Sequence, residues 1–337
     1  MTAASLNTQI MLNTQVSLKT EDRLRRSRYA RDPAAAPRAL TPLMVQALQT
    51  VGDFRFASLP QLVRLHGDPA RSGGSSKAVQ RAMRALLDAG LVDVIPVPRA
   101  ILAAPGEAND ATLLFGSAPN LYAPTKAGLK LLCENGMTGE GGIAGGTRPG
   151  AAYGPKNALF LRHEMEVRDV RVWAVIAAAA RPRTGLLEWR DGAEAAISLG
   201  AERAPRHVRP DARFVLRLGR ADSREAVLVG LVEVDRGTER GERRWGEKIE
   251  AYGSLLEGDR LRDATGYVNA RVLVICPDAR RRDALAGLIA RRADPALAAR
   301  FWLAGRDALA RPDLGRSDWR RADSPLMRPL VPPDLQG

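Results

Sequence analysis

The sequence has few residues that could cross-link the chain or form a zinc site. Its 337 residues include two cysteines and three histidines. Cys133 and Cys276 lie far apart, and neither has a CxxC or CxxH companion. This pattern argues against a zinc site and against a disulfide framework. We expect two reduced, buried thiols.

Long apolar runs are also missing. The longest near-apolar stretch, VWAVIAAAA at residues 172–180, is much shorter than the roughly 20 residues that a membrane-spanning helix needs. The N-terminus is polar and lacks the charged-then-apolar pattern of a secretory signal. We therefore expect a cytoplasmic protein with no membrane partner. Aromatic residues make up only 5% of the chain, but an apolar content of 45% is enough for a core.

What the chain has in excess is positive charge. Lysine and arginine number 51 against 38 acidic residues, which gives a net charge of +13, and most of the basic residues are arginine. Such a balance favours polyanionic partners, and arginine suits bidentate contacts with phosphate. A GC-rich genome would also enrich arginine, so charge alone does not identify nucleic acid as the partner.

The length favours two domains, and residues 1–39 precede them as a flexible basic arm. The arm carries a cluster of arginines that is followed by a Pro/Ala segment: Arg23, Arg25, Arg26, Arg28 and Arg31. Such arms often lie along DNA phosphates, although an ordinary solvated tail fits the same composition.

Residues 40–137 show a helix–helix–helix–strand–strand pattern. Thr41 and Ser58 are expected to cap the first two helices, and the third helix is expected at residues 76–89. The strands are expected at residues 91–97 and 120–125, with a long hairpin between them and a closing helix after them. This order predicts a winged helix-turn-helix that binds double-stranded DNA.

The third helix would enter the major groove. Its outer face carries four polar or basic residues, of which we expect Gln80, Arg81 and Arg84 to face base edges and Lys77 to face phosphate. The charge of this segment is modest, however, with nine lysine and arginine residues against seven acidic residues between Thr41 and Met137. A winged helix that binds another protein therefore remains an alternative.

A Gly-rich stretch at residues 138–154 separates the two halves. No strand precedes it and no GKS or GKT follows it, so a hinge is a better interpretation than a phosphate-binding loop. Residues 155–312 then alternate between helical and strand-like patterns, which predicts a mixed α/β sheet with helices on its faces. Residues 313–337 are Pro-rich and are expected to form a loose tail.

Acidic residues interrupt this second domain at positions that apolar packing does not explain. Asp211 follows a proline at a strand start, and Glu233 and Asp235 share one face at the end of an apolar strand. Lys248 follows on a predicted helix. A PD-(D/E)xK nuclease core has the same order: one acid on a strand, a second acid on the next strand, and a lysine on the helix that follows. In such a core Asp211 and Glu233 would hold Mg²⁺ or Mn²⁺ while Lys248 orients water or neutralises charge.

Two further residues are candidates for the same site. His163 and Glu166 lie one turn apart on the first helix of this domain, where nuclease cores often add an acid or a water-holding group. Each candidate also has an ordinary alternative: a turn acid, a surface ion pair with Arg236, Arg240 or Arg244, plain helix surface, or a core histidine. The third motif position is Asp235 where an active nuclease usually has lysine, so either Lys248 replaces it or the site is inactive.

Together these segments resemble the replication-relaxation family of plasmids and integrative mobile elements. The resemblance rests on LTPLMVQALQTVGDFRFASLPQLVRLH, NLYAPTKAGLKLL, the helix with His163, VRPDARFVLRL, VEVDRGTE with EKIEAYGSLL, and RVLVICPDARRRDALAGLI. It implies a winged helix joined to a restriction-endonuclease-like domain, in a protein of DNA replication, relaxation or mobilisation.

Three functions remain open at this point. The first is a DNA-binding accessory protein whose second domain nicks or clamps DNA. The second is a transcriptional or replication regulator whose inactive nuclease-like domain serves dimerisation, as in a homodimer, or contact with a partner. The third is an adaptor for a relaxase or replication protein.

Overall fold

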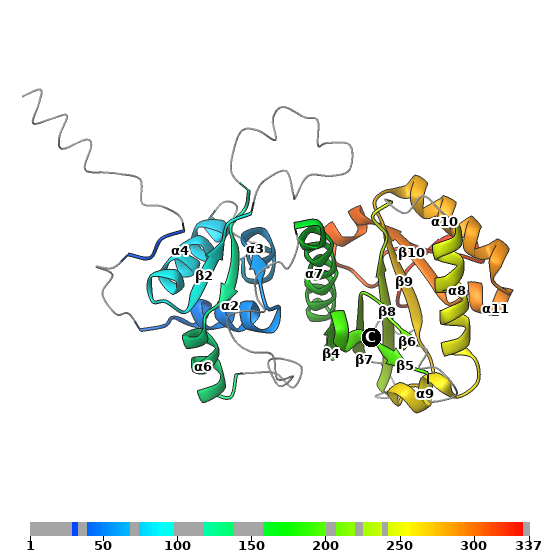
Figure 1. Ribbon diagram of the computed structural model, residues 1–337, viewed down its shortest axis with the longest axis horizontal. Coiled ribbons are helices and arrows are strands. Elements are labelled where there is room, and N and C mark those ends of the chain that lie inside the picture. The colour runs from blue at the N-terminus through cyan, green and yellow to red at the C-terminus, as the bar shows by residue number, and fades with distance from the viewer. Residues whose placement is uncertain are drawn as a thin grey trace, which may run out of the picture.

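The computed structural model describes residues 29–32, 39–67, 74–97, 118–137, 158–199, 207–219, 225–237 and 242–332. Figure 1 shows two units, with one long helix, α7 (Ala158–Ala179), between them. Most of the expected arm, most of the hairpin expected between residues 97 and 120, and the Gly-rich stretch at residues 138–154 lie outside the described residues.

The first unit contains the helices that the sequence predicts. They are α2 (Pro42–Asp53), α3 (Leu59–His66), α4 (Gly74–Asp88) and α6 (Lys126–Glu134). Both predicted N-caps are confirmed: the Thr41 side chain accepts a hydrogen bond from the Met44 amide, and Ser58 forms a reciprocal capping box with Gln61. Such caps satisfy amides that have no partner within the helix.

A small antiparallel sheet completes the first unit. Its order is β1 (Ala57–Ser58), β3 (Leu121–Pro124) and β2 (Val92–Ile95). The hairpin partners β2 and β3 occur where the sequence predicts strands, whereas β1 is too short to give a sequence pattern. Apolar side chains of α2, α3 and α4 meet in one core, including Leu48, Leu62 and Met83.

The second unit is built on a sheet of seven strands. Its order is β12 (Met327–Arg328), β11 (Trp319–Arg321), β10 (Phe301–Gly305), β9 (Arg271–Cys276), β8 (Glu225–Val234), β7 (Ala212–Gly219) and β4 (Gly185–Asp191). Strands β8, β9 and β10 are parallel, and the other neighbours are antiparallel. The predicted mixed sheet is therefore present.

Helices cover both faces of this sheet. On one face α7 places Trp173 against Phe214, Val232 and Leu273. On the other face α8 (Glu242–Leu256) and α10 (Ala279–Arg292) pack against alternate residues of the same strands. The remaining elements are α9 (Arg260–Thr265), α11 (Pro295–Ala298), the 3₁₀ helices η3 (Gly192–Ala195) and η4 (Arg306–Ala310), and the strand pair β5 (Ile197–Ser198) and β6 (His207–Val208).

Helix α7 also packs against the first unit. Its Leu161 and Val172 belong to apolar clusters of that unit, while Trp173 belongs to the sheet core. Polar contacts join the same surfaces: the Gln61 amide donates to Asp169 at 2.8 Å, and Arg171 donates to the Asp53 carbonyl at 2.7 Å. One helix therefore contributes to the cores of both units.

Two expectations about single segments are wrong. The predicted loose tail is ordered through residue 332, because it adds β11 and β12 to the sheet and buries Trp319, Leu330 and Val331. The Trp319 ring meets the Trp173 ring edge-to-face at 5.7 Å. The second unit therefore extends past residue 312. Of the two expected buried thiols, Cys276 is buried but Cys133 is exposed.

In the part of the chain that the structure describes, no helix is long and apolar enough to cross a membrane.

Candidate functional site

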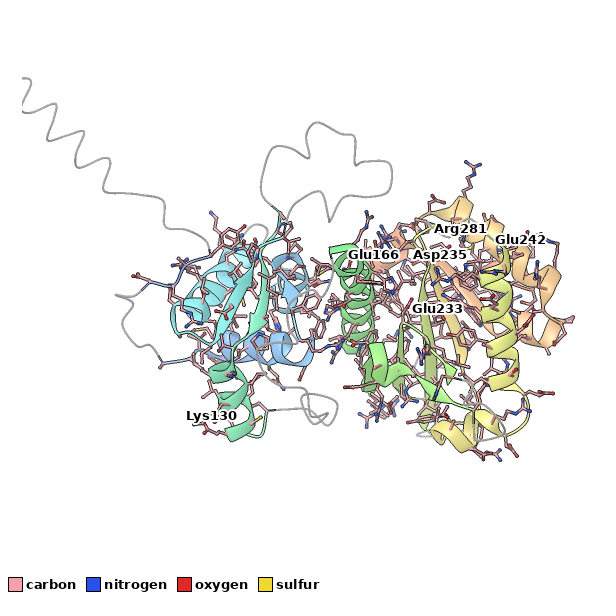
Figure 2. The ribbon with its side chains drawn as sticks, viewed as in Figure 1. Lys130, Glu166, Glu233, Asp235, Glu242 and Arg281 are labelled. Atoms are coloured by element: carbon pink, nitrogen blue, oxygen red, sulfur yellow. The ribbon has the colours of Figure 1, made fainter. Side chains whose placement is uncertain are left out.

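The candidate residues of the second unit gather at one edge of its sheet. Strands β8, β9 and β10 are parallel, so their carboxyl ends lie together, and Asp211 precedes the antiparallel β7 at the same edge. Figure 2 shows Glu166, Asp235 and Arg281 at this end of the unit. The carboxyl edge of an open α/β sheet is where ligands commonly bind.

Glu233 is the most deeply buried acid of the group. Its side chain accepts hydrogen bonds from the Lys248 ammonium at 2.8 Å and from the Tyr252 hydroxyl at 2.7 Å. Burial raises the pKa of Glu233 to about 7, even though the neighbouring Lys248 lowers it, and the charge of Asp211 raises it further. A carboxyl group with this pKa exchanges protons near neutral pH, as a general base or acid must.

Asp211 lies beside Glu233 and holds two different donors. One oxygen accepts the Val234 amide at 2.7 Å, and the other lies 3.0 Å from Nε2 of His163. Burial would lower the pKa of His163, but the hydrogen bond and charge of Asp211, together with the charge of Glu166, outweigh it and raise the pKa. His163 therefore reaches the acidic pair from α7, as the sequence predicts.

Asp235 forms an ion pair with Arg281, outside the Asp211–Glu233 pair. It lies on the same side of β8 as Glu233, but its side chain binds Nε of Arg281 at 2.5 Å and accepts the Gly237 amide. Arg281 comes from the first turn of α10. The third position of the PD-(D/E)xK pattern, Asp235, thus belongs to an ion pair with Arg281, and Lys248 supplies the ammonium at Glu233.

Glu166 is surrounded by guanidinium groups. It binds Arg162 and Arg306, each at 2.9 Å, and Arg236 at 3.8 Å. The expected extra acid on α7 is therefore present at this edge but is neutralised by arginines. Among the partners that the sequence reasoning missed, Tyr252 carried a signal, since it follows Lys248 by one helical turn. Arg281 and Arg306 carried none, because only the fold brings them here.

A divalent cation would find two acidic side chains at this edge. Asp211 and Glu233 are adjacent, and carboxylate oxygens are the ligands that Mg²⁺ and Mn²⁺ prefer. Both oxygens of each already accept protein hydrogen bonds, and the described residues contain no cluster of three His, Cys, Asp or Glu side chains able to hold a metal. The pair fits a metal in its chemistry, with His163 and Lys248 as the groups that would have to move.

The predicted DNA-binding residues lie on α4. Lys77, Gln80 and Arg81 are exposed on its outer face. Arg84 instead binds Asp88 one turn away at 2.9 Å, and it is half-buried. The structure therefore places three of the four residues together on the surface and directs the fourth to its own helix. Of the predicted basic arm, Arg31 is described, and it pairs with Asp93 of β2 at 2.8 Å.

Comparison with known families adds one finding. A profile described as replication-relaxation matches residues 48–270, which spans most of the first unit, all of α7, Asp211 and the strand that carries Glu233. Neither the curated proteins nor the solved structures yield a match. Since the matched segment covers more than half of the chain, this protein belongs to the replication-relaxation family.

Proposed function

We propose that this protein is a DNA-binding accessory protein of a plasmid or mobile element, and that the Asp211–Glu233–Lys248 site nicks DNA. Membership of the replication-relaxation family suggests a role in the replication or relaxation of such elements, with DNA or replication proteins as partners. The observation that carries the nicking proposal is the 2.8 Å contact between Lys248 and Glu233, next to Asp211.

The order of elements around this contact supports a nuclease-like core. Helix α7 is followed by the antiparallel strands β4, β7 and β8, then by helix α8 and the parallel strand β9. The first acid precedes the second of these strands, the second acid lies at the end of the third, and the lysine lies on α8. These are the positions that the PD-(D/E)xK pattern in the sequence predicts.

Each side chain has a role in hydrolysis of a phosphodiester bond. A divalent cation held by Asp211 and Glu233 would supply Lewis acidity and lower the pKa of a bound water. Lys248 places positive charge where the phosphate becomes more negative. Because a metal ligand must be deprotonated, cation binding would displace the proton that Glu233 holds below its pKa of about 7. Tyr252 fixes the orientation of Glu233 through its hydroxyl.

The first unit supports binding to double-stranded DNA. Helices α3 and α4 pack together, and α4 presents Lys77, Gln80 and Arg81 to solvent beside the β2–β3 hairpin. This arrangement fits a winged helix-turn-helix in which α4 enters the major groove and the hairpin lies along the backbone. Phosphate contacts then position the protein, while side chains on the groove edge select the site.

A second candidate function has its own observation. Asp235 is held by Arg281, and both oxygens of Asp211 and Glu233 accept protein hydrogen bonds. An acidic site closed in this way favours a regulator that holds DNA on a nuclease-shaped scaffold without cutting it. Such a protein binds DNA with a steep dependence on salt and without an effect of metal.

Plasmid nicking separates the two candidates. Supercoiled plasmid is incubated with Mg²⁺ or Mn²⁺ and either wild-type protein, Asp211→Ala, Glu233→Ala or Lys248→Ala. Glu242→Ala is the matched control, because Glu242 lies on the same helix as Lys248 but is exposed and binds Arg292. We expect nicking by the wild type and the control, and loss of nicking in the other three variants.

DNA binding is measured on the same samples by gel shift. Absence of nicking in the wild type, with DNA binding retained, would rule out the nuclease and support the scaffold. Nicking that persists in Asp211→Ala and Glu233→Ala would place the activity elsewhere. Absence of DNA binding by the wild-type protein would contradict both the nuclease and the scaffold.

A further inference from the structure

A second charged site lies at the opposite end of the same strands. Arg271 begins β9, and Arg300 directly precedes β10, whereas the acidic site lies at the carboxyl ends of these strands. Glu233 of the acidic site lies opposite Val274, which is three positions, or about 10 Å, along β9 from Arg271. The two sites are therefore distinct places on one sheet.

The residues here line a cavity. Its volume is about 360 Å³, and its walls include Arg271, Arg300, Arg321, Trp302 and Asn269. Trp302 and Arg321 are direct neighbours across β10 and β11. The guanidinium of Arg271 lies over the Trp302 ring, 4.4 Å from its centroid. This volume is near the lower end of the range for small-molecule sites, roughly 300–1,000 Å³.

Among the described residues that line the cavity, basic side chains outnumber their acidic partners. Arg321 binds the carboxylate of Asp323, but Arg271 donates to the Leu330 carbonyl and Arg300 donates to the Asn269 amide oxygen. Both of these acceptors are neutral. Burial, and then the charges of Arg321 and Arg300, lower the pKa of Arg271 to about 10. Counted over the described residues, three guanidinium groups and one carboxylate give an excess of two positive charges at the cavity.

We propose that this cavity binds a terminal phosphate group, as carried by a nucleotide or by the phosphorylated end of a DNA strand. A phosphate monoester carries close to two negative charges at neutral pH, which matches the excess of positive charge. Guanidinium groups bind phosphate oxygens through paired, charge-assisted hydrogen bonds. The site lies apart from the proposed nicking site and does not depend on it.

Titration calorimetry with deoxyadenosine monophosphate tests the proposal, and deoxyadenosine serves as the ligand control. We expect saturable binding of the nucleotide and none of the nucleoside. Arg300→Gln and Arg271→Gln should each weaken nucleotide binding by about tenfold or more, the effect of losing a charged hydrogen bond. Arg262→Gln is the protein control, because Arg262 is exposed on α9 and pairs with Asp259. It should bind like the wild type.

Thermal unfolding without ligand checks the fold of each variant. Arg300→Gln removes one of three mutually repelling charges and should leave the unfolding midpoint unchanged or raise it. Arg271→Gln also loses the contacts with Trp302 and the Leu330 carbonyl, so its midpoint should fall. Arg300→Gln keeps the test decisive if Arg271→Gln does not fold, because the Arg300 guanidinium donates to the Asn269 side chain at an exposed position, whereas Arg271 holds the Leu330 carbonyl.

Two DNA duplexes that differ only in a 5′-phosphate distinguish the sources of the ligand. Tighter binding of the phosphorylated duplex, lost in Arg300→Gln, would identify a strand end as the ligand. Equal binding of both duplexes, with the nucleotide still bound, would identify a free nucleotide. Equal binding of nucleotide and nucleoside, or wild-type affinity in Arg300→Gln, would overturn the proposal.

Discussion

The guanidinium of Arg168 lies over the ring of Phe56, with its central carbon 3.5 Å from the ring centroid. Arg168 belongs to α7, and Phe56 belongs to the first unit. The same guanidinium donates to the carbonyls of Phe54 and Phe56 at 3.0 and 3.1 Å. Burial lowers the pKa of Arg168 to about 10. The buried charge of Arg168 therefore lies at the junction between the two units.

Arg168→Ala should destabilise the protein and uncouple the two units. The change removes the stacked cation and leaves two buried carbonyls without their donor, which costs about 2–4 kcal/mol. In urea unfolding followed by tryptophan fluorescence and circular dichroism, we expect the two signals to separate into distinct transitions. Arg262→Ala, at an exposed ion pair, should change stability by less than about 0.5 kcal/mol. Coincident transitions with wild-type stability in Arg168→Ala would contradict this role.

Glu233 should make stability depend on pH. Its pKa is raised from 4.5 to about 7 by burial, so between these values the folded protein holds a proton that the unfolded chain has released. Stability must then fall as pH rises through this window, by about 1.4 kcal/mol for each unit of pKa shift. Between pH 4.5 and 8, wild type should lose more stability than Glu233→Gln in urea unfolding.

The control for this pH dependence is Glu257→Gln, at an exposed glutamate that pairs with Arg260. It should retain the wild-type slope of stability against pH. Identical slopes for the wild type and Glu233→Gln would show that Glu233 titrates normally.

His163 should report directly on Asp211. The pKa of His163 is raised above its ordinary value of 6.5 in the folded protein. The ion pair with Asp211 therefore stabilises the fold fully below pH 6.5, and this stabilisation is lost as the pH rises through the pKa of the folded state. Asp211→Asn removes the charge that supports the imidazolium, so the pKa of His163 should fall. Proton NMR can follow this change because the chain has only three histidines.

His66 is the internal reference in that titration. It contacts Thr50 in the first unit, and burial lowers its pKa. Its titration curve should not move in Asp211→Asn. A shift of both histidines would indicate a general change of structure, and an unchanged His163 would show that Asp211 is not its dominant partner.

The face of α4 should determine how DNA binding depends on salt. Lys77→Ala and Arg81→Ala should each weaken binding to duplex DNA and reduce the slope of log affinity against log salt by about one. Arg84→Ala should have a smaller effect on binding, because Arg84 binds Asp88. Lys130→Ala on α6, where Lys130 pairs with Glu134, is the control (Figure 2). Equal salt slopes in all four variants would remove α4 from the DNA interface.

Local chemistry explains which parts of the fold could be predicted from the sequence. Thr41 and Ser58 mark helix starts through their own side chains, and β7 to β9 show as apolar runs bounded by breaks. Strands β1, β11 and β12 have two or three residues, too few for any periodicity, and they form because longer strands offer an edge. The ordered tail follows from the burial of Trp319, which composition alone does not reveal.

The candidate site also has a part that the sequence predicts and a part that depends on the fold. Asp211, Glu233 and Lys248 were predictable, because strand alternation and helix placement bring them to one edge. The Asp235–Arg281 pair was not predictable, because 46 residues separate its members and only the packing of α10 on the sheet joins them. The same holds for Arg168, which reads in the sequence as one more arginine on a helix.

The shared helix α7 has a mechanical consequence. It carries His163, which contacts Asp211 of the acidic site. One to two turns later it carries Arg168 and Asp169, which form hydrogen bonds with the first unit. Because both units pack on this one helix, a tilt of the first unit would displace the imidazole that faces Asp211. The proposed DNA-binding unit and the proposed nicking site are therefore joined by one helix that packs in the cores of both units.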